Sequence, residues 1–193
     1  MKLNVEQLVQ EMTLEEKAGL CSGENFWFTK AVERLGIPGI MVTDGPHGLR
    51  KQAKQADHLG LNASVEAVCF PAGCALASSF DRALLQSVGE KLGEEAWSEH
   101  VHTLLGPAIN IKRSPLCGRN FEYLSEDPYL AGELAASYIN GVQSQDVGVS
   151  VKHFACNNQE RRRMSVSARI SQRALHEIYL AAFETAVKKA HPW

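Results

Sequence analysis

The chain has 193 residues, of which 45% are hydrophobic, so it is long enough for one domain with a core and too short for two large domains. Its formal net charge of −2 shows no dominant sign, so neither nucleic acid nor a membrane surface is expected as a partner. No run approaches the ~20 apolar residues of a membrane span, and the mixed polar start is not expected to be a signal peptide.

The N-terminal part of the sequence predicts one helix and two strands. Thr13 and Glu16 have the spacing of a capping box, which starts a helix that runs through Leu20. The apolar run at 39–43, bounded by glycine and proline, is typical of a buried strand. Residues 70–77 form a second, weaker strand candidate.

The middle of the sequence predicts a long amphipathic helix followed by a strand. The helix covers 82–98, and either Asp81 or Ser79 is expected to cap its first turn. Its apolar face is formed by Leu84, Leu85, Val88 and Leu92. A strand over 101–105 then continues loosely through 108–111.

The last part predicts a strand between two helices. Ser125 and Pro128 start a helix that ends near Gly141. A strand covers 147–154, and a final helix covers 171–190. Four strands that alternate with helices indicate an α/β fold built from parallel βα units. In such folds the functional groups lie just past the carboxyl ends of the strands.

Polar clusters follow three of the four predicted strands. TDGPHGLR follows the first strand at 43–50, and GRNFEY follows the third at 118–123. KHF at 152–154 follows the fourth, and NNQE and three arginines extend this cluster to 163. Carboxylates accept protons from sugar hydroxyls, while arginine and lysine donate to hydroxyl oxygens, so the clusters suit a polyol ligand.

These three motifs, in this order and spacing, resemble glycoside hydrolase family 3, especially its bacterial and fungal β-glucosidase members. MTLEEKAGLCSG at 12–23 and FPAGCALASSFD at 70–81 are also similar to that family, and the resemblance extends from Val5 to Trp193. It implies an N-terminal (β/α)8 barrel domain. Such a barrel needs ~200 residues or more, so residues 1–193 are expected to form its N-terminal portion, an incomplete barrel of about four βα units.

The resemblance also implies a function and a set of substrate-binding residues. The activity would be hydrolysis of terminal β-D-glucosyl residues with retention of anomeric configuration, which needs two carboxylates and no cofactor. Asp44 would hold hydroxyls of the terminal glucose, and Arg50 would support that carboxylate. The substrate-binding side chains would be Asp44, Arg50, Arg119, Lys152, His153 and Arg163.

The catalytic carboxylates of the family are not recognisable in the sequence. The family's nucleophile is the aspartate of a Ser-Asp-Trp motif, and none of the five aspartates here precedes a tryptophan. The family's acid/base glutamate lies later still. We therefore assign no catalytic residue and expect the isolated chain to be inactive. The end at 191–193 is interpreted as a truncation, and half a barrel would expose strand edges, so we expect self-association or pairing with a complementary chain.

Simpler interpretations stay open for the candidate residues. Asp44 also suits a turn cap, Arg119 a surface ion pair, and 152–153 an ordinary strand end. Arg161 and Arg162 are expected on a solvated face, as basic runs usually are.

Other residues suggest chemistry less strongly. Glu122 and Asp44 are a candidate carboxylate pair on chemistry alone. The aromatic residues at 26–28 can stack on sugars, but in an early loop they more often fill the bottom of a core. For the whole chain, a non-catalytic sugar-binding or structural module is the alternative to an enzyme fragment.

Metal and disulfide chemistry are not expected. His100 and His102 share one face of a strand, but no third metal ligand is evident. The five cysteines are odd in number and contain no C-x-x-C pair. Scattered thiols are typical of a reducing compartment, so the protein is expected in the cytoplasm.

Overall fold

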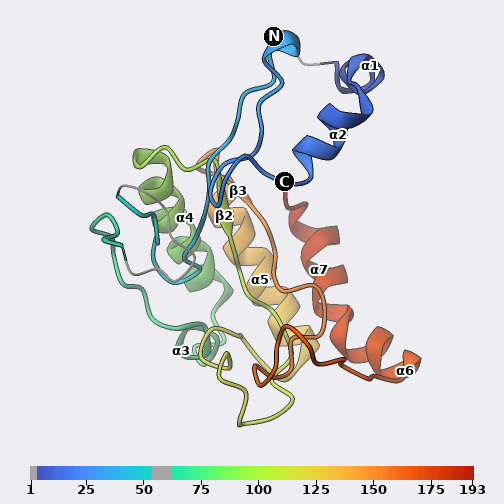
Figure 1. Ribbon diagram of the computed structural model, residues 1–193. Coiled ribbons are helices and arrows are strands. Elements are labelled where there is room, and N and C mark those ends of the chain that lie inside the picture. The colour runs from blue at the N-terminus through green and yellow to red at the C-terminus, as the bar shows by residue number, and fades with distance from the viewer. Residues whose placement is uncertain (1–3, 54–61) are drawn as a thin grey trace.

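The computed structural model describes residues 4–53 and 62–193. Three parallel strands form one sheet in the order β1 (Val42–Asp44), β2 (Thr103–Leu105) and β3 (Gly148–Val149) (Figure 1). Parallel neighbours require crossover connections, and helices provide them here. The predicted α/β fold with a parallel sheet is therefore confirmed.

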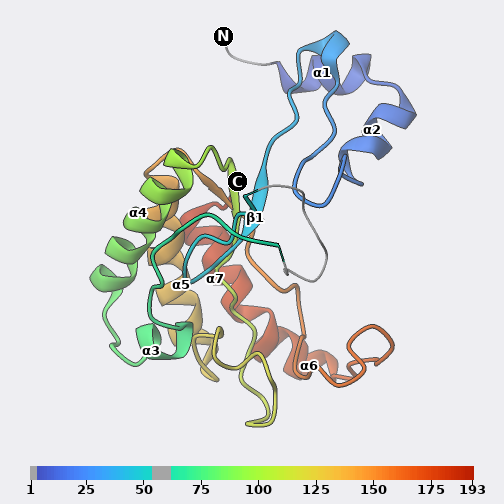
Figure 2. The same cartoon turned by 60° about the vertical axis from the view of Figure 1, so that its left-hand side comes forward.

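Three long helices lie side by side on one face of the sheet (Figures 1 and 2). They are α4 (Arg82–Ser98), α5 (Pro128–Gln143) and α7 (Ala181–Ala190), with α5 between the other two. The shorter elements are α1 (Val5–Glu11), α2 (Leu14–Leu20), η1 (Glu33–Leu35), α3 (Gly73–Ala77), α6 (Gln172–Ala174) and the π-helical turn η2 (Leu175–Tyr179). The predicted helix over 171–190 is thus continued through a π-turn.

Side-chain caps define where the helices begin. The capping box predicted for α2 is present, because Thr13 and Glu16 each bond to the other's backbone N–H. Asp81, rather than Ser79, caps α4 by accepting from two backbone N–H groups. Asp127 caps α5 directly before Pro128, a residue that suits the first helical turn.

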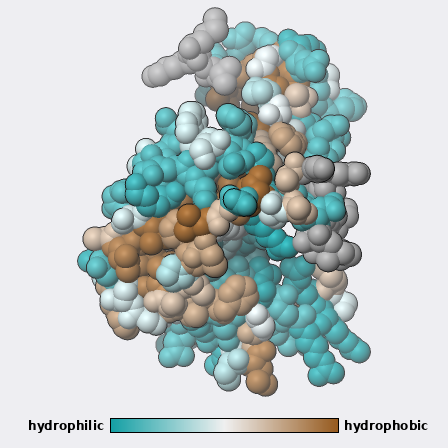
Figure 3. Space-filling model, turned by 90° about the vertical axis from the view of Figure 1, so that its left-hand side faces the viewer, coloured by the Kyte–Doolittle hydropathy of each residue, from teal (hydrophilic) through white to brown (hydrophobic). Residues whose placement is uncertain are grey.

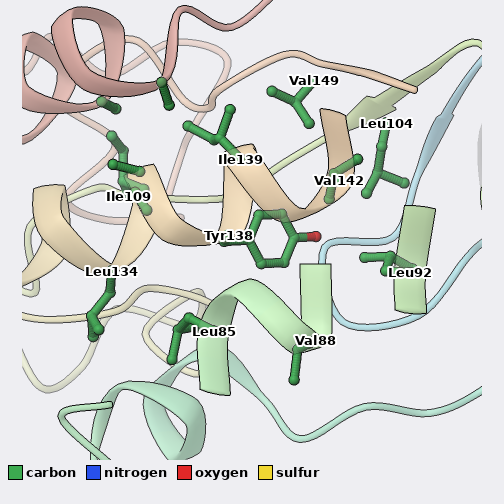
Figure 4. Close-up of a cluster of buried hydrophobic side chains, with 14 of the residues drawn as sticks. Leu85, Val88, Leu92, Leu104, Ile109, Leu134, Tyr138, Ile139, Val142 and Val149 are labelled. Atoms are coloured by element: carbon green, nitrogen blue, oxygen red, sulfur yellow. The ribbon is translucent and has the colours of Figure 1, made fainter. Parts of the chain in front are cut away.

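The core lies between the helices and the sheet (Figure 4). Its fully buried side chains include Leu85, Leu92, Leu104, Leu134, Ile139, Val142 and Val149. Leu84, predicted on the apolar face of α4, is instead 42% exposed. The helices α4 and α5 approach closely at Gly141, which has no side chain. A Cβ atom added there would lie only 2.2 Å from the carbonyl oxygen of Gln86.

The strand predicted over 70–77 is wrong, because α3 occupies 73–77. A short apolar run has no periodicity that separates a buried strand from a buried helix. Tertiary contacts decided the conformation: the Cys74 N–H donates to the carbonyl of Phe121, and a Cβ atom at Gly73 would lie 2.4 Å from the carbonyl oxygen of Glu122. The described sheet therefore has three strands, not the four that were predicted.

The strand predicted over 147–154 is regular only at its start, in β3. Beyond it, hydrogen bonds continue irregularly: Lys152 donates its N–H to the carbonyl of Pro107, and Ile109 donates to the carbonyl of Lys152. This irregular pairing carries the chain past the end of the sheet, so that the side chains after β2 and β3 lie side by side.

Apolar surface reaches the exterior beside polar surface (brown and teal in Figure 3). Exposed large side chains include Leu116, Phe154, Met164 and Trp193. Among the described residues, no helix combines the length and the apolar character needed to cross a bilayer.

Candidate functional site

A cavity of about 710 Å³ opens at the carboxyl ends of the strands. Asp44 ends β1, Leu105 ends β2, and Ser150 and Lys152 follow β3. All six predicted substrate-binding residues line this cavity. The lining also includes Phe26, Trp27, Leu105, Phe121, Glu122, Ser150 and Glu160.

Asp44 and Lys152 form an ion pair across the cavity. The Nζ atom of Lys152 lies 2.5 Å from Oδ1 of Asp44, and the two side chains are 14% and 37% exposed. Burial by itself raises the pKa of Asp44, but the charge and hydrogen bond of Lys152 outweigh it and lower the pKa below its ordinary value. Asp44 is therefore an ionised carboxylate at neutral pH.

The loop after β1 folds back so that the backbone of Arg50 pairs with the backbone of Asp44. Gly45 has a φ of 125°, and a Cβ atom there would lie 2.1 Å from the carbonyl oxygen of Gly48, so the turn requires glycine. The Arg50 N–H donates to the Asp44 carbonyl at 3.0 Å, and the Thr43 hydroxyl donates to the Arg50 carbonyl at 2.8 Å. Exposed Arg50 thus forms the cavity wall beside Asp44, where its charge helps lower that carboxyl's pKa.

Glu122 connects two of the predicted cations. Its side chain is 5% exposed, and Oε1 accepts a hydrogen bond from Nε of Arg119. Its other oxygen lies 3.9 Å from Nζ of Lys152. A buried carboxylate is costly unless it is paired, and these two cations supply the pairing. Glu122 was considered only as a catalytic carboxylate, yet here it holds the two cations in place.

His153 lies between Asn110 and Arg119. Its Nε2 is 2.7 Å from Nη2 of Arg119, and its Nδ1 is 3.1 Å from Oδ1 of Asn110. Burial, with the charges of Arg119 and Lys152, lowers the pKa of His153 to about 4. The imidazole is therefore neutral at physiological pH and can accept a hydrogen bond.

Glu160 supports the opposite side of Arg119. One oxygen lies 3.5 Å from Nη1 of Arg119, and the other lies 3.7 Å from Nε of Arg163. Asn157 donates to Glu160 at 2.7 Å and to the hydroxyl of buried Tyr123 at 2.9 Å. Arg163, whose role the sequence left open, thus joins the charged wall of the cavity.

The aromatic residues near the N-terminus also belong to the site. Phe26 and Trp27 line the cavity and contact each other edge to face, with ring centroids 4.6 Å apart. Trp27 packs partly against the core, and its Nε1 donates to Gln52 at 3.1 Å. Trp27 thus meets the core, as the core-filling interpretation expects, but Phe26 and Trp27 also form part of the cavity wall.

The sequence reasoning assigned no role to Asn110, Asn157 or Glu160, and it considered Glu122 only as a catalytic carboxylate. Glu122 and Glu160 lie inside the quoted polar motifs, so their proximity to arginine was a usable signal. Asn110 lies in an apolar stretch, and no local pattern marked it. Arg161 and Arg162 are exposed, as expected for a solvated face.

The arrangement presents hydrogen-bond donors and acceptors in one concave site. Asp44 can accept from a ligand, Lys152 and Arg119 can donate, and neutral His153 accepts from Arg119. Within the described ranges, no group of three or more His, Cys, Asp or Glu residues is placed to hold a metal ion. His102, considered above as a metal ligand, accepts through Nδ1 from the N–H of Met41 at 3.0 Å. The site is therefore suited to a neutral ligand rich in hydroxyl groups.

Known proteins are similar to this chain in sequence and in fold. The family described as "Glycosyl hydrolase family 3 N terminal domain" matches residues 13–191. The chain is 63% identical to thermostable beta-glucosidase B of Acetivibrio thermocellus, over 100% of this chain and 26% of that protein. It is 57% identical to an exo-alpha-(1->6)-L-arabinopyranosidase of Bifidobacterium breve, over 96% of this chain and 25% of that protein.

A solved structure agrees with these sequence matches. Beta-glucosidase 3B from Thermotoga neapolitana, in complex with alpha-D-glucose, matches with a TM-score of 0.88 and 45% identity, over 99% of this chain and 28% of that chain. The present chain thus spans about a quarter of the length of the relatives that it matches.

Proposed function

The chain belongs to glycosyl hydrolase family 3, and from this premise we propose that it forms the part of a β-glucosidase that binds the terminal glucosyl unit. One observation carries the proposal. All six side chains that the family resemblance assigns to sugar binding line a single cavity of about 710 Å³ at the ends of the strands.

The chemistry of this cavity supports a sugar ligand. Asp44 has one oxygen bound to Lys152, and a carboxylate has further lone pairs that can accept from hydroxyl groups. Charge-assisted hydrogen bonds of this kind are stronger than neutral ones. The rings of Phe26 and Trp27 add apolar surface on which a sugar face can pack.

The proposal includes a division of the site between this chain and further sequence. A chain that spans about a quarter of its relatives leaves most of a family member unaccounted for. The Ser-Asp-Trp motif is absent here, so we place the nucleophile and the acid/base carboxylate outside these 193 residues. On this proposal the chain by itself binds the sugar and does not cleave a glycoside.

The three-stranded sheet supports an incomplete barrel as the architecture of the chain. β1 and β3 are the outer strands of the described sheet. The Val42 N–H of β1 already donates to the Trp27 carbonyl, so the outer edge of β3 is the place where we propose that a further strand pairs. We therefore expect one of two partners: a complementary chain that carries the rest of the barrel, or a second copy of this chain. Sedimentation tests this: a monodisperse monomer with one sharp cooperative melt would contradict it.

One of the comparisons suggests a second candidate sugar for the cavity. The chain is almost as similar to an enzyme named for an L-arabinopyranoside as to one named for a glucoside. The same cavity therefore has a competing candidate ligand, L-arabinose. D-glucose, L-arabinose and D-galactose should be compared in one titration series.

Isothermal titration of the chain with each sugar, beside a turnover assay on an aryl β-glucoside, tests the proposal. We expect glucose binding without turnover, and at least a tenfold loss of affinity, about 1.4 kcal/mol or more, in Asp44→Ala. Asp81→Ala is the matched control, because Asp81 caps α4 and does not line the cavity.

The outcomes separate the alternatives. Absence of binding by every sugar contradicts the proposed sugar site. Turnover above background contradicts the placement of the catalytic carboxylates outside the chain and would direct attention to Glu122. If sugar binds but turnover does not appear when the downstream sequence is supplied, the non-catalytic sugar-binding module is favoured over the enzyme.

A further inference from the structure

We propose that Asn110 is a positioning residue that holds the His153 ring in one tautomer, with its unprotonated Nε2 directed toward Arg119 and the cavity. The inference rests on the proposed function in one respect: the tautomer of His153 matters for binding only if the cavity takes a sugar. The relevant geometry is independent of whether a sugar binds.

Asn110 is buried and fully engaged. Its side chain lies in the segment after β2, and the residue is 1% exposed. Its Nδ2 donates to the carbonyls of His153 and Ala155, both at 2.9 Å. Its Oδ1 accepts the backbone N–H of His153 at 2.8 Å. One amide thus binds both backbone groups of His153.

These contacts determine which way the amide points. Two carbonyl oxygens can be satisfied only by the NH2 end, and a backbone N–H only by the oxygen end. The reverse orientation would face two acceptors with an acceptor, and a donor with a donor. Oδ1 of Asn110 therefore faces the backbone N–H and the ring of His153.

The orientation of the amide then sets the tautomer of the ring. Nδ1 of His153 lies 3.1 Å from the same Oδ1 of Asn110, so Nδ1 carries the proton and donates it. In the neutral ring, Nε2 is left with a lone pair. Arg119 Nη2 lies 2.7 Å from Nε2, and because a guanidinium can only donate, it donates to that lone pair.

This arrangement determines how Arg119 is presented to a sugar. An unprotonated Nε2 has one lone pair, and Arg119 Nη2 occupies it, so His153 positions the guanidinium rather than accepting from a ligand hydroxyl. Arg119 keeps its other N–H groups for Glu122, Glu160 and the cavity. Asn110 therefore acts through His153 on the orientation of Arg119, whose remaining N–H groups are donors in the cavity wall.

Long-range ¹H–¹⁵N spectra of the histidine rings test the proposal directly, with His153→Gln used to assign the signal. We expect the wild-type chain to show His153 in the Nδ1–H form. Asn110→Ala should convert it to a mixture of tautomers. Asn110→Asp should retain the Nδ1–H form, because a carboxyl at this buried position is expected to be protonated, so that one oxygen donates to a carbonyl and the other accepts from Nδ1. Asn120→Ala is the matched control: its amide donates to Ser114, not to His153.

Glucose titration adds a second readout. We expect about tenfold weaker binding in Asn110→Ala, the loss of roughly one charge-assisted hydrogen bond. An Nε2–H signal in the wild-type chain, or an unchanged tautomer in folded Asn110→Ala, overturns the proposal. If Asn110→Ala does not fold, Asn110→Asp decides it, because loss of the Nδ1–H form in a folded Asn110→Asp chain overturns it equally. A wild-type chain that binds no sugar refutes the proposed function alone, since the tautomer is measured without ligand.

Discussion

Lys152 and Asp44 are 108 residues apart in the chain, yet Nζ of Lys152 lies 2.5 Å from Oδ1 of Asp44. The contact joins the segment after β3 to the end of β1, at the carboxyl ends of the strands. Glu122, 3.9 Å from the same ammonium, extends the pair into the network around Arg119. The charges of the candidate site are therefore balanced by one another before any ligand arrives.

This ion pair should be measurable in a double-mutant cycle. Asp44→Asn and Lys152→Gln should each lower the free energy of unfolding by about 1–3 kcal/mol, because each leaves a partly buried charge without its partner. The coupling between the two should be about 1 kcal/mol in urea unfolding. Lys91→Gln, in an exposed pair with Glu94, should show little change. Strict additivity of the two site variants would contradict a stabilising pair.

The contact between α4 and α5 should make Gly141→Ala destabilising. Alanine usually favours a helix over glycine, but a Cβ atom here would lie 2.2 Å from the Gln86 carbonyl oxygen. We expect a loss of about 1–3 kcal/mol in chemical unfolding from this overpacking. At Gly19 in α2 the nearest atom is the flexible Lys30 Cδ, at 3.3 Å. Gly19→Ala should therefore be neutral or stabilising by up to about 1 kcal/mol, and equal effects at both sites would refute the packing argument.

Glu133 should contribute more to stability than an ordinary surface carboxylate. Its side chain is 8% exposed and binds Arg82 on α4 at 2.9 Å and Lys189 on α7, so it joins three helices from α5. Glu133→Gln should lower the free energy of unfolding by about 1 kcal/mol, measured by urea unfolding. Glu184→Gln removes an exposed i,i+4 pair with Lys188 and should have no measurable effect. A Glu133→Gln chain as stable as wild type would rule out this role.

Two histidines should make the chain less stable below neutral pH. Burial, with the charge of Lys152, lowers the pKa of His47 from 6.5 to about 4, and the pKa of His153 is likewise lowered to about 4. Between these values the unfolded chain binds more protons than the folded chain. The free energy of unfolding should therefore fall as pH decreases through this window, by at most about 1.4 kcal/mol per pH unit for each histidine.

Thermal melts from about pH 7 to about pH 4.5 measure this dependence. The variant that combines His47→Gln with His153→Gln should show a shallower decline than wild type. His176→Gln, at an exposed position, should retain the wild-type decline. An unchanged slope in the double variant would show that other groups control the acid sensitivity.

Local interactions made much of the fold predictable. The capping box of Thr13 and Glu16, the Asp81 cap and the helix over 82–98 depend on residues within a few positions of one another. The polar clusters that contain the candidate residues could also be located from sequence, because the ends of parallel strands meet at one edge of a sheet. The choice of six sugar-binding residues within those clusters came from the resemblance to glycoside hydrolase family 3.

Other features depended on contacts between distant segments. Residues 70–77 have no periodicity that distinguishes strand from helix, and packing against the GRNFEY loop decided for α3. Phe26 and Trp27 reached the cavity only because the N-terminal loop runs alongside β1, where the Val42 N–H donates to the Trp27 carbonyl.

The sequence by itself determined the α/β alternation, the helix starts and the polar clusters that follow the strands, because short-range hydrogen bonds and hydrophobic periodicity specify them. The tertiary structure decided how the side chains of those clusters pair. Asp44 with Lys152 and Asn110 with His153 are brought together by the parallel arrangement of β1, β2 and β3, whereas Glu122 and Arg119 lie three residues apart in one turn. The first two pairs join residues more than 40 positions apart, and polar complementarity alone allows many other pairings, so only the folded sheet could select them.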